Sequence, residues 1–112
     1  LKFAREMLKR MNLEEGPSAT ADSIIKLVSA HFGIKPSDIR GSRRTRNISI
    51  PRQVAMYLAR QHTDDSYPEL GRKFGGKDHT TVLAACRRMD KEIAAKSALA
   101  ESIQEIDTLI ER

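Results

Sequence analysis

Cysteine and aromatic residues are scarce in this chain of 112 residues. Cys86 is the only cysteine, which excludes an internal disulfide and a metal site of paired cysteines. A lone cysteine is also typical of a reducing cytosol. Tryptophan is absent and aromatic residues make up 4% of the sequence, so a core must be built mainly from aliphatic side chains. We therefore expect a cytoplasmic protein that holds no metal.

Long apolar runs are missing as well. No stretch approaches the roughly 18–20 apolar residues of a membrane span, and no charged segment followed by an apolar one suggests a signal peptide. The chain opens with Leu1 and not with Met, so we expect a piece of a longer protein. Its length suits a single domain.

Acidic charge is missing from the middle of the chain. No Asp or Glu lies between Asp38 and Asp64, whereas this segment holds Arg40, Arg43, Arg44, Arg46, Arg52 and Arg60. The net charge of +5 favours an anionic partner, most often nucleic acid. A solvated surface of mixed charge is the competing interpretation, and charge alone does not decide between them.

Strand-like alternation is absent, and the abundance of Ala, Leu, Arg, Lys and Glu favours helices. Apolar spacing, capping residues and breaks predict helices at 1–12, from Thr20 or Asp22 to Gly33, at 34–39, from Pro51 to Thr63, at 68–74, at 79–95 and at 97–111. The prediction is an all-α bundle of about six helices, preceded by a helix and a linker.

Residues 68–95 have the plan of a helix-turn-helix, in which the start of the second helix contacts bases. A short helix is followed by a turn containing Gly75 and Gly76 and by a longer helix. The second helix places apolar residues on one face, which we expect to be buried: Val82, Cys86, Met89 and Ile93.

Each residue at the start of this second helix has a chemistry suited to bases. Asp78 can cap the helix, accept a hydrogen bond from a cytosine amino group, or do both. His79 can donate to guanine or thymine, while Thr80 and Thr81 offer a hydroxyl group and a methyl group. Arg43 lies in a polar loop dense in guanidinium groups, which we assign to phosphate contacts.

Three runs of residues, 51–58, 66–71 and 74–83, together with the basic loop at 42–46, resemble the C-terminal DNA-binding domain (domain IV) of the DnaA family of bacterial chromosomal replication initiators. The most specific part is Asp78-His79-Thr80-Thr81 preceded by Gly75-Gly76. The resemblance covers residues 20–112 in layout and 42–93 in residue detail.

The resemblance implies a Trp-repressor-like helix-turn-helix domain that binds asymmetric DnaA boxes at the replication origin, as a nucleoid-associated monomer. The residues it implies for base reading in the major groove are Tyr67, Pro68, Asp78, His79, Thr80 and Thr81, with Arg44 in the adjacent minor groove. It places five positions near phosphates: Arg52, Gln53, Arg60, Thr63 and Lys77. Tyr67 departs from the leucine of many members. Lys77 replaces a common arginine, so we assign it to phosphate and not to a base.

The resemblance also divides the chain. It implies that residues 1–18 are a connecting helix and linker from a missing AAA+ domain, and that residues 19–112 are the DNA-binding domain. ATP and Mg are expected only in the parent protein, so this chain should need no cofactor and should not be an enzyme. Acidic phospholipids are a possible partner of the connecting helix, through Lys2, Arg5, Lys9 and Arg10. A helix-turn-helix transcriptional regulator and a protein-docking module stay open as alternatives.

Overall fold

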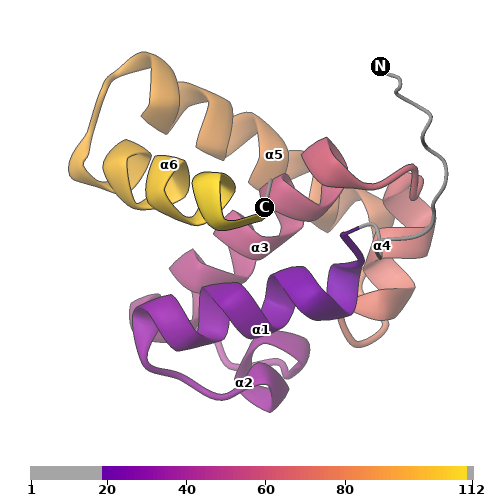
Figure 1. Cartoon of the computed structure of the whole chain (residues 1–112). Helices are drawn as coiled ribbons and strands as arrows, with labels where there is room; N and C mark the ends of the chain where they lie inside the picture. The colour runs from indigo at the N-terminus through magenta and orange to yellow at the C-terminus, as the bar shows by residue number, and fades with distance from the viewer. Residues whose placement is uncertain (1–18, 111–112) are drawn as a thin grey trace, which may run out of the picture.

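The computed structural model describes residues 19–110, which form six α-helices and no strand (Figure 1). The helices are α1 (Ala21–Phe32), α2 (Pro36–Arg40), α3 (Arg46–His62), α4 (Tyr67–Lys73), α5 (His79–Ala94) and α6 (Ala98–Ile110). The expected all-α class is confirmed. The helix predicted at 1–12 and the linker that follows it lie outside the described residues.

Helix α3 is the centre of the fold, because it contacts each of the other five helices. Helix α1 packs on α3, with the short α2 beneath them in Figure 1. Helices α5 and α6 lie side by side as a hairpin, and α4 packs against α5 at the other end of the molecule. The helix-turn-helix formed by α4 and α5 is thus supported along its length by α3.

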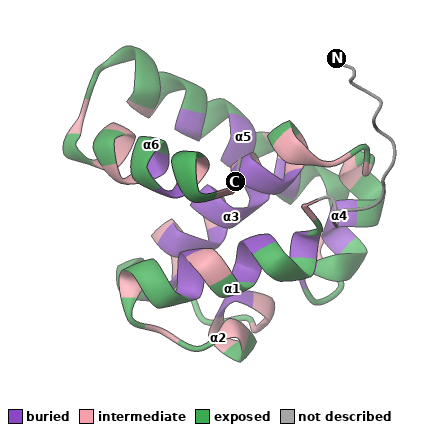
Figure 2. Ribbon diagram, viewed as in Figure 1, coloured by how far each residue is buried: buried purple, intermediate pink, exposed green. Residues whose placement is uncertain are grey.

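The core is aliphatic, as the scarcity of aromatic residues predicts, with Phe74 as its one fully buried aromatic side chain in the part of the chain described. Purple segments mark the faces that the helices turn toward one another in Figure 2. Large side chains with almost no exposed surface include Ile24, Ile25, Ile39, Met56, Leu58, Leu70, Met89 and Ile106. Helices α1 to α6 therefore share one continuous core.

Most helix ends fall where capping chemistry predicts. Thr20 caps α1 in a reciprocal pair with Ser23, and Gly33 ends this helix at φ 70°. Pro51 is the exception, since it lies inside α3 and not at its first position. The predicted start was wrong because Arg46–Ile50 adds a turn that buries Ile48 in the core, which offsets the backbone hydrogen bond that a proline cannot donate.

The apolar face predicted for α5 is confirmed at Val82, Cys86 and Met89, which are buried. It is wrong at Ile93, whose exposed fraction is 36%. Ile93 is the penultimate residue of α5, where it borders an open groove between α3, α5 and α6 and not the closed core.

Candidate nucleic-acid interface

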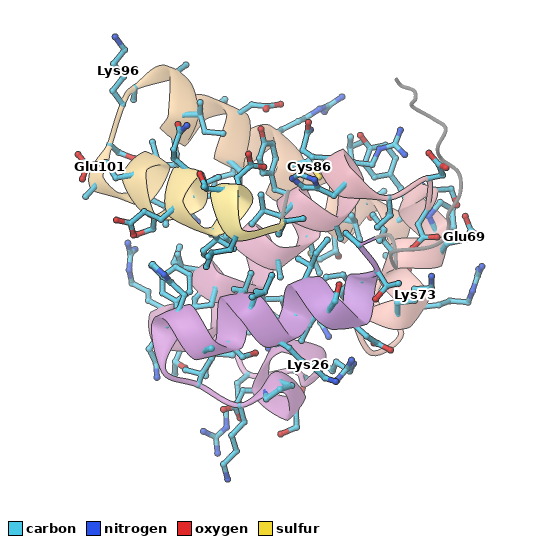
Figure 3. The ribbon with its side chains drawn as sticks, viewed as in Figure 1. Lys26, Glu69, Lys73, Cys86, Lys96 and Glu101 are labelled. Atoms are coloured by element: carbon cyan, nitrogen blue, oxygen red, sulfur yellow. The ribbon has the colours of Figure 1, made fainter. Side chains whose placement is uncertain are left out.

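Local hydrogen bonding fixes the start of α4. The Ser66 hydroxyl accepts from the Glu69 backbone N–H, and the Glu69 carboxylate accepts from the Ser66 N–H in return. These bonds hold the pKa of Glu69 below its ordinary value. Glu69 and Lys73 point outward from α4, at the opposite end of the molecule from Lys96 and Glu101 (Figure 3).

The turn between α4 and α5 is closed on the backbone. Phe74 anchors it with no exposed surface, and the Lys77 N–H donates to the Gly71 carbonyl at 2.8 Å. Gly75 and Gly76 have φ values of 92° and 79°, a region that L side chains rarely adopt. The turn therefore needs both glycines that the sequence provides.

The first turn of α5 is presented to solvent. Asp78, His79, Thr80 and Thr81 are all exposed, while Val82 directly after them is buried and fixes the helix. Asp78 occupies the N-cap position, yet its side chain makes no capping hydrogen bond. Its carboxylate is therefore free to accept a hydrogen bond from a ligand.

A concave groove of about 740 Å³ runs beside this turn. It brings together six residues that the sequence assigned to DNA: Arg44, Arg52, Gln53, Lys77, Thr80 and Thr81. The groove is lined by the basic loop, by α3, by the turn before α5 and by α5 itself. Arg44 is exposed, so its guanidinium can extend beyond the groove.

The remaining predicted residues do not line this groove. Arg43, Asp78 and His79 are exposed outside it, and a second group gathers at the start of α4: Arg60, Thr63, Tyr67 and Pro68. The Arg60 guanidinium stacks over the Tyr67 ring at 4.6 Å and donates to the Asp65 carbonyl at 2.9 Å. The Thr63 hydroxyl donates to the Ala59 carbonyl at 2.7 Å. The predicted interface thus has two parts.

Arg52 and Lys77 differ from the other predicted phosphate ligands because the protein itself uses their charged groups. Arg52 is 6% exposed and its guanidinium donates to three backbone carbonyls. The Lys77 ammonium donates to two more. Burial lowers the pKa of both side chains. Their phosphate contacts stay predictions, which now compete with an internal role.

Three polar residues that line the groove were missed by the sequence analysis: Ser42, Ser49 and Arg88. Arg88 had a readable signal, because Thr80, Ala84 and Arg88 recur every four residues along one face of a helix. The two serines had none, since only the packing of the basic loop against α3 brings them to the groove.

We also examined residues 19–110 for a metal site, a reactive thiol and a membrane-spanning helix. Residues 19–110 contain no group of three His, Cys, Asp or Glu side chains able to hold a metal ion. Burial and nearby Asp90 raise the pKa of the Cys86 thiol to about 11, which suppresses the nucleophilic thiolate. None of the six helices is long and apolar enough to cross a membrane.

Known proteins match this chain over most of its length. The family described as "Bacterial dnaA protein helix-turn-helix" matches residues 21–89. The chromosomal replication initiator protein DnaA of Limosilactobacillus fermentum is 46% identical over 99 residues, which are 88% of this chain and 23% of that protein. The protein of the same name from Cereibacter sphaeroides is 40% identical over 111 residues, or 99% of this chain and 24% of that one.

A third relative, the DnaA protein of Citrifermentans bemidjiense, is 38% identical over 106 residues, covering 95% of this chain and 23% of its own length. The chain thus spans about a quarter of the length of these relatives. Since the matched family covers residues 21–89 and the described fold contains the helix-turn-helix that it names, this chain belongs to the family of bacterial DnaA C-terminal helix-turn-helix domains.

Proposed function

We propose that this domain binds double-stranded DNA in a sequence-specific manner, at DnaA boxes of a chromosomal replication origin. One observation carries the proposal: the exposed first turn of α5 and the exposed Arg44 of the basic loop line the same groove. A helix of this kind fits the major groove, where each base pair presents a distinct set of donors and acceptors. An exposed arginine suits the narrow minor groove of A·T-rich DNA.

The shape of the groove supports this arrangement. Adjacent major and minor grooves of a duplex are separated by one sugar-phosphate strand. If Thr80 and Thr81 read the major groove while Arg44 enters the minor groove, that strand must run between them. The residues there are suited to phosphate oxygens, since Ser42, Ser49, Gln53 and Arg88 bring hydroxyl, amide and guanidinium donors.

The start of α4 supports a second contact with the same major groove. Tyr67 and Pro68 form the first turn of α4, and the Tyr67 ring packs partly against the core. Arg60 covers this ring with a positive charge, which favours an approaching phosphate. We assign Tyr67 and Pro68 to apolar contacts with bases and Arg60 and Thr63 to the adjoining backbone.

The proposal extends to the parent protein. Its role would be that of an ATP-dependent initiator acting at the nucleoid in the cytoplasm, with ATP and Mg bound in a separate AAA+ domain. The candidate phospholipid contacts at Lys2, Arg5, Lys9 and Arg10 lie outside the described residues. A monomer suits an asymmetric box.

A competition assay tests the proposal. Fluorescence anisotropy would measure binding of the chain to a duplex with one DnaA box and to a scrambled duplex of equal length and composition, at several salt concentrations. We expect a clear preference for the box, in the range of 10³-fold or more at physiological salt. Equal affinity for the two duplexes would refute box recognition, and the absence of DNA binding would favour a protein-docking module.

A further inference from the structure

The C-terminal end of α2 is held by an arginine from a different helix. Arg52 of α3 donates through Nε to the Ile39 carbonyl at 2.7 Å and through its two Nη atoms to the carbonyls of Arg43 at 2.7 Å and Asp38 at 2.9 Å. Two of these carbonyls belong to the last turn of α2, and the third belongs to the basic loop. One planar group thus joins α2 and the basic loop to α3.

Lys77 holds the same end of α2 from the other side. Its ammonium donates to the Arg40 carbonyl at 3.1 Å and to the Phe74 carbonyl at 2.7 Å. Gly75 is packed so closely here that a Cβ atom would lie 1.9 Å from the Arg40 oxygen. Lys77 and Gly75 both belong to the turn that leads into α5. The end of α2 therefore packs directly against the turn at the start of α5. We call Arg52, Lys77, Gly75 and the carbonyls that they contact the α2 junction.

The physics of a five-residue helix explains why this junction is needed. Helix α2 is too short to be stable alone, and its last carbonyls lack partners within the helix. These carbonyls form the negative end of the helix dipole, which two cations satisfy. Charged donors make stronger hydrogen bonds than neutral ones, and Arg52 makes them where little water competes. Burial and, after it, the positive charge of Arg52 lower the pKa of Lys77.

We propose that Arg52 and Lys77 are positioning residues that fix the distance between Arg44 and the first turn of α5, so that the major and minor grooves are read together. This inference rests on the proposed DNA binding. Arg44 directly follows Arg43, whose carbonyl Arg52 binds, and Thr80 lies three residues after Lys77. Neither positioning side chain needs to touch DNA for this effect.

The proposal and the predicted phosphate contacts differ in what they do to binding. A phosphate contact contributes equally to every sequence, and its loss reduces the salt slope by about one unit. A positioning contact contributes only when both grooves are read, so its loss lowers the affinity for the box and leaves the scrambled duplex and the salt slope nearly unchanged. The two roles therefore predict different results for the same substitutions.

The test uses Arg52→Lys, which keeps the charge and loses the three-way hydrogen bonding, with Arg72→Lys on the exposed surface of α4 as its control. Affinities for the box and scrambled duplexes would be measured across salt concentrations, with and without Arg44→Ala. In the Arg52→Lys background we expect roughly tenfold weaker box binding. There Arg44→Ala should reduce box affinity little further, whereas in the Arg72→Lys background it should cause its full loss of affinity.

Lys77→Met serves as a second variant, in case Arg52→Lys lowers the melting temperature below the assay temperature. It should also weaken box binding more than scrambled binding and reduce the effect of Arg44→Ala. If either folded variant weakens both duplexes equally, reduces the salt slope by about one unit, or adds independently to Arg44→Ala, the proposal is overturned. If the unsubstituted chain does not distinguish the two duplexes, the proposed function fails instead, and the comparison separates these two failures.

Discussion

Replacing Gly75 by alanine should destabilise the domain far more than the same change at its neighbour Gly76. Both glycines have positive φ, which costs an L-residue about 1–2 kcal/mol. At Gly75 the new Cβ would also lie 1.9 Å from the Arg40 oxygen, whereas a Cβ added at Gly76 would meet no heavy atom within 4 Å beyond its chain neighbours. Forcing this overlap apart adds roughly 1–3 kcal/mol. We therefore expect losses of about 2–5 kcal/mol for Gly75→Ala and about 1–2 kcal/mol for Gly76→Ala.

Urea unfolding followed by circular dichroism measures the difference. The gain that alanine brings by restricting the unfolded chain is common to both variants and cancels in the comparison. Domains of this kind are stable by about 5–15 kcal/mol, so Gly75→Ala removes a large share and lowers the urea midpoint on the order of 1 M. Equal midpoints for the two variants would refute the reasoning, because the contact between the turn and α2 would then contribute nothing to stability.

Three further predictions concern DNA contacts and the one thiol. Thr80→Ala should weaken box binding by about 1–3 kcal/mol and random DNA much less, as measured by anisotropy; a uniform loss would place Thr80 on the backbone. Arg44→Ala should weaken box binding mainly by losing a contact at the A·T-rich end of the box. Replacing the A·T pairs there by G·C pairs, which add an amino group to the minor groove, should shrink this loss, whereas an unchanged loss would place Arg44 on a phosphate. For Cys86, whose folded-state pKa is about 11 against an ordinary 9.0, the unfolded chain loses its proton first as pH rises. Stability should therefore be unaffected below about pH 9 and fall by roughly 2–3 kcal/mol toward pH 11, and Cys86→Ala should abolish that fall in urea titrations.

Local chemistry made the helix-turn-helix predictable. Pro68 and Ser66 mark the start of α4, Gly75 and Gly76 mark the turn, and Asp78 precedes α5, all within one residue of the observed positions. Capping and turn residues act on neighbours in sequence, so a sequence shows them directly. The spacing of apolar residues in α5 is equally local, and it identified three of the four residues expected on the buried face, Val82, Cys86 and Met89.

Tertiary contacts account for what the sequence did not show. Arg52 looks like any basic residue near a DNA-binding motif, and only the folded chain brings it to the carbonyl of Ile39, 13 residues away. Lys77 reaches back 37 residues to Arg40 in the same way. The start of α3 was predicted wrongly at Pro51. The preference of proline for a helix start stabilises less than the burial of Ile48 one turn earlier. The DNA contacts of the site residues stay predictions.

The unused carboxylate of Asp78 has a consequence for the specificity of the proposed DNA interface. It is exposed at the start of α5 and makes no capping hydrogen bond, within a region otherwise rich in positive charge. A carboxylate can accept a hydrogen bond and cannot donate one, so it is repelled by phosphate oxygens and by the acceptor edges of guanine. Specificity is a difference between affinities, and a group that penalises wrong partners enlarges this difference even when it adds little to the correct one. Asp78 would thus act largely by lowering the affinity of a strongly basic domain for DNA of other sequences.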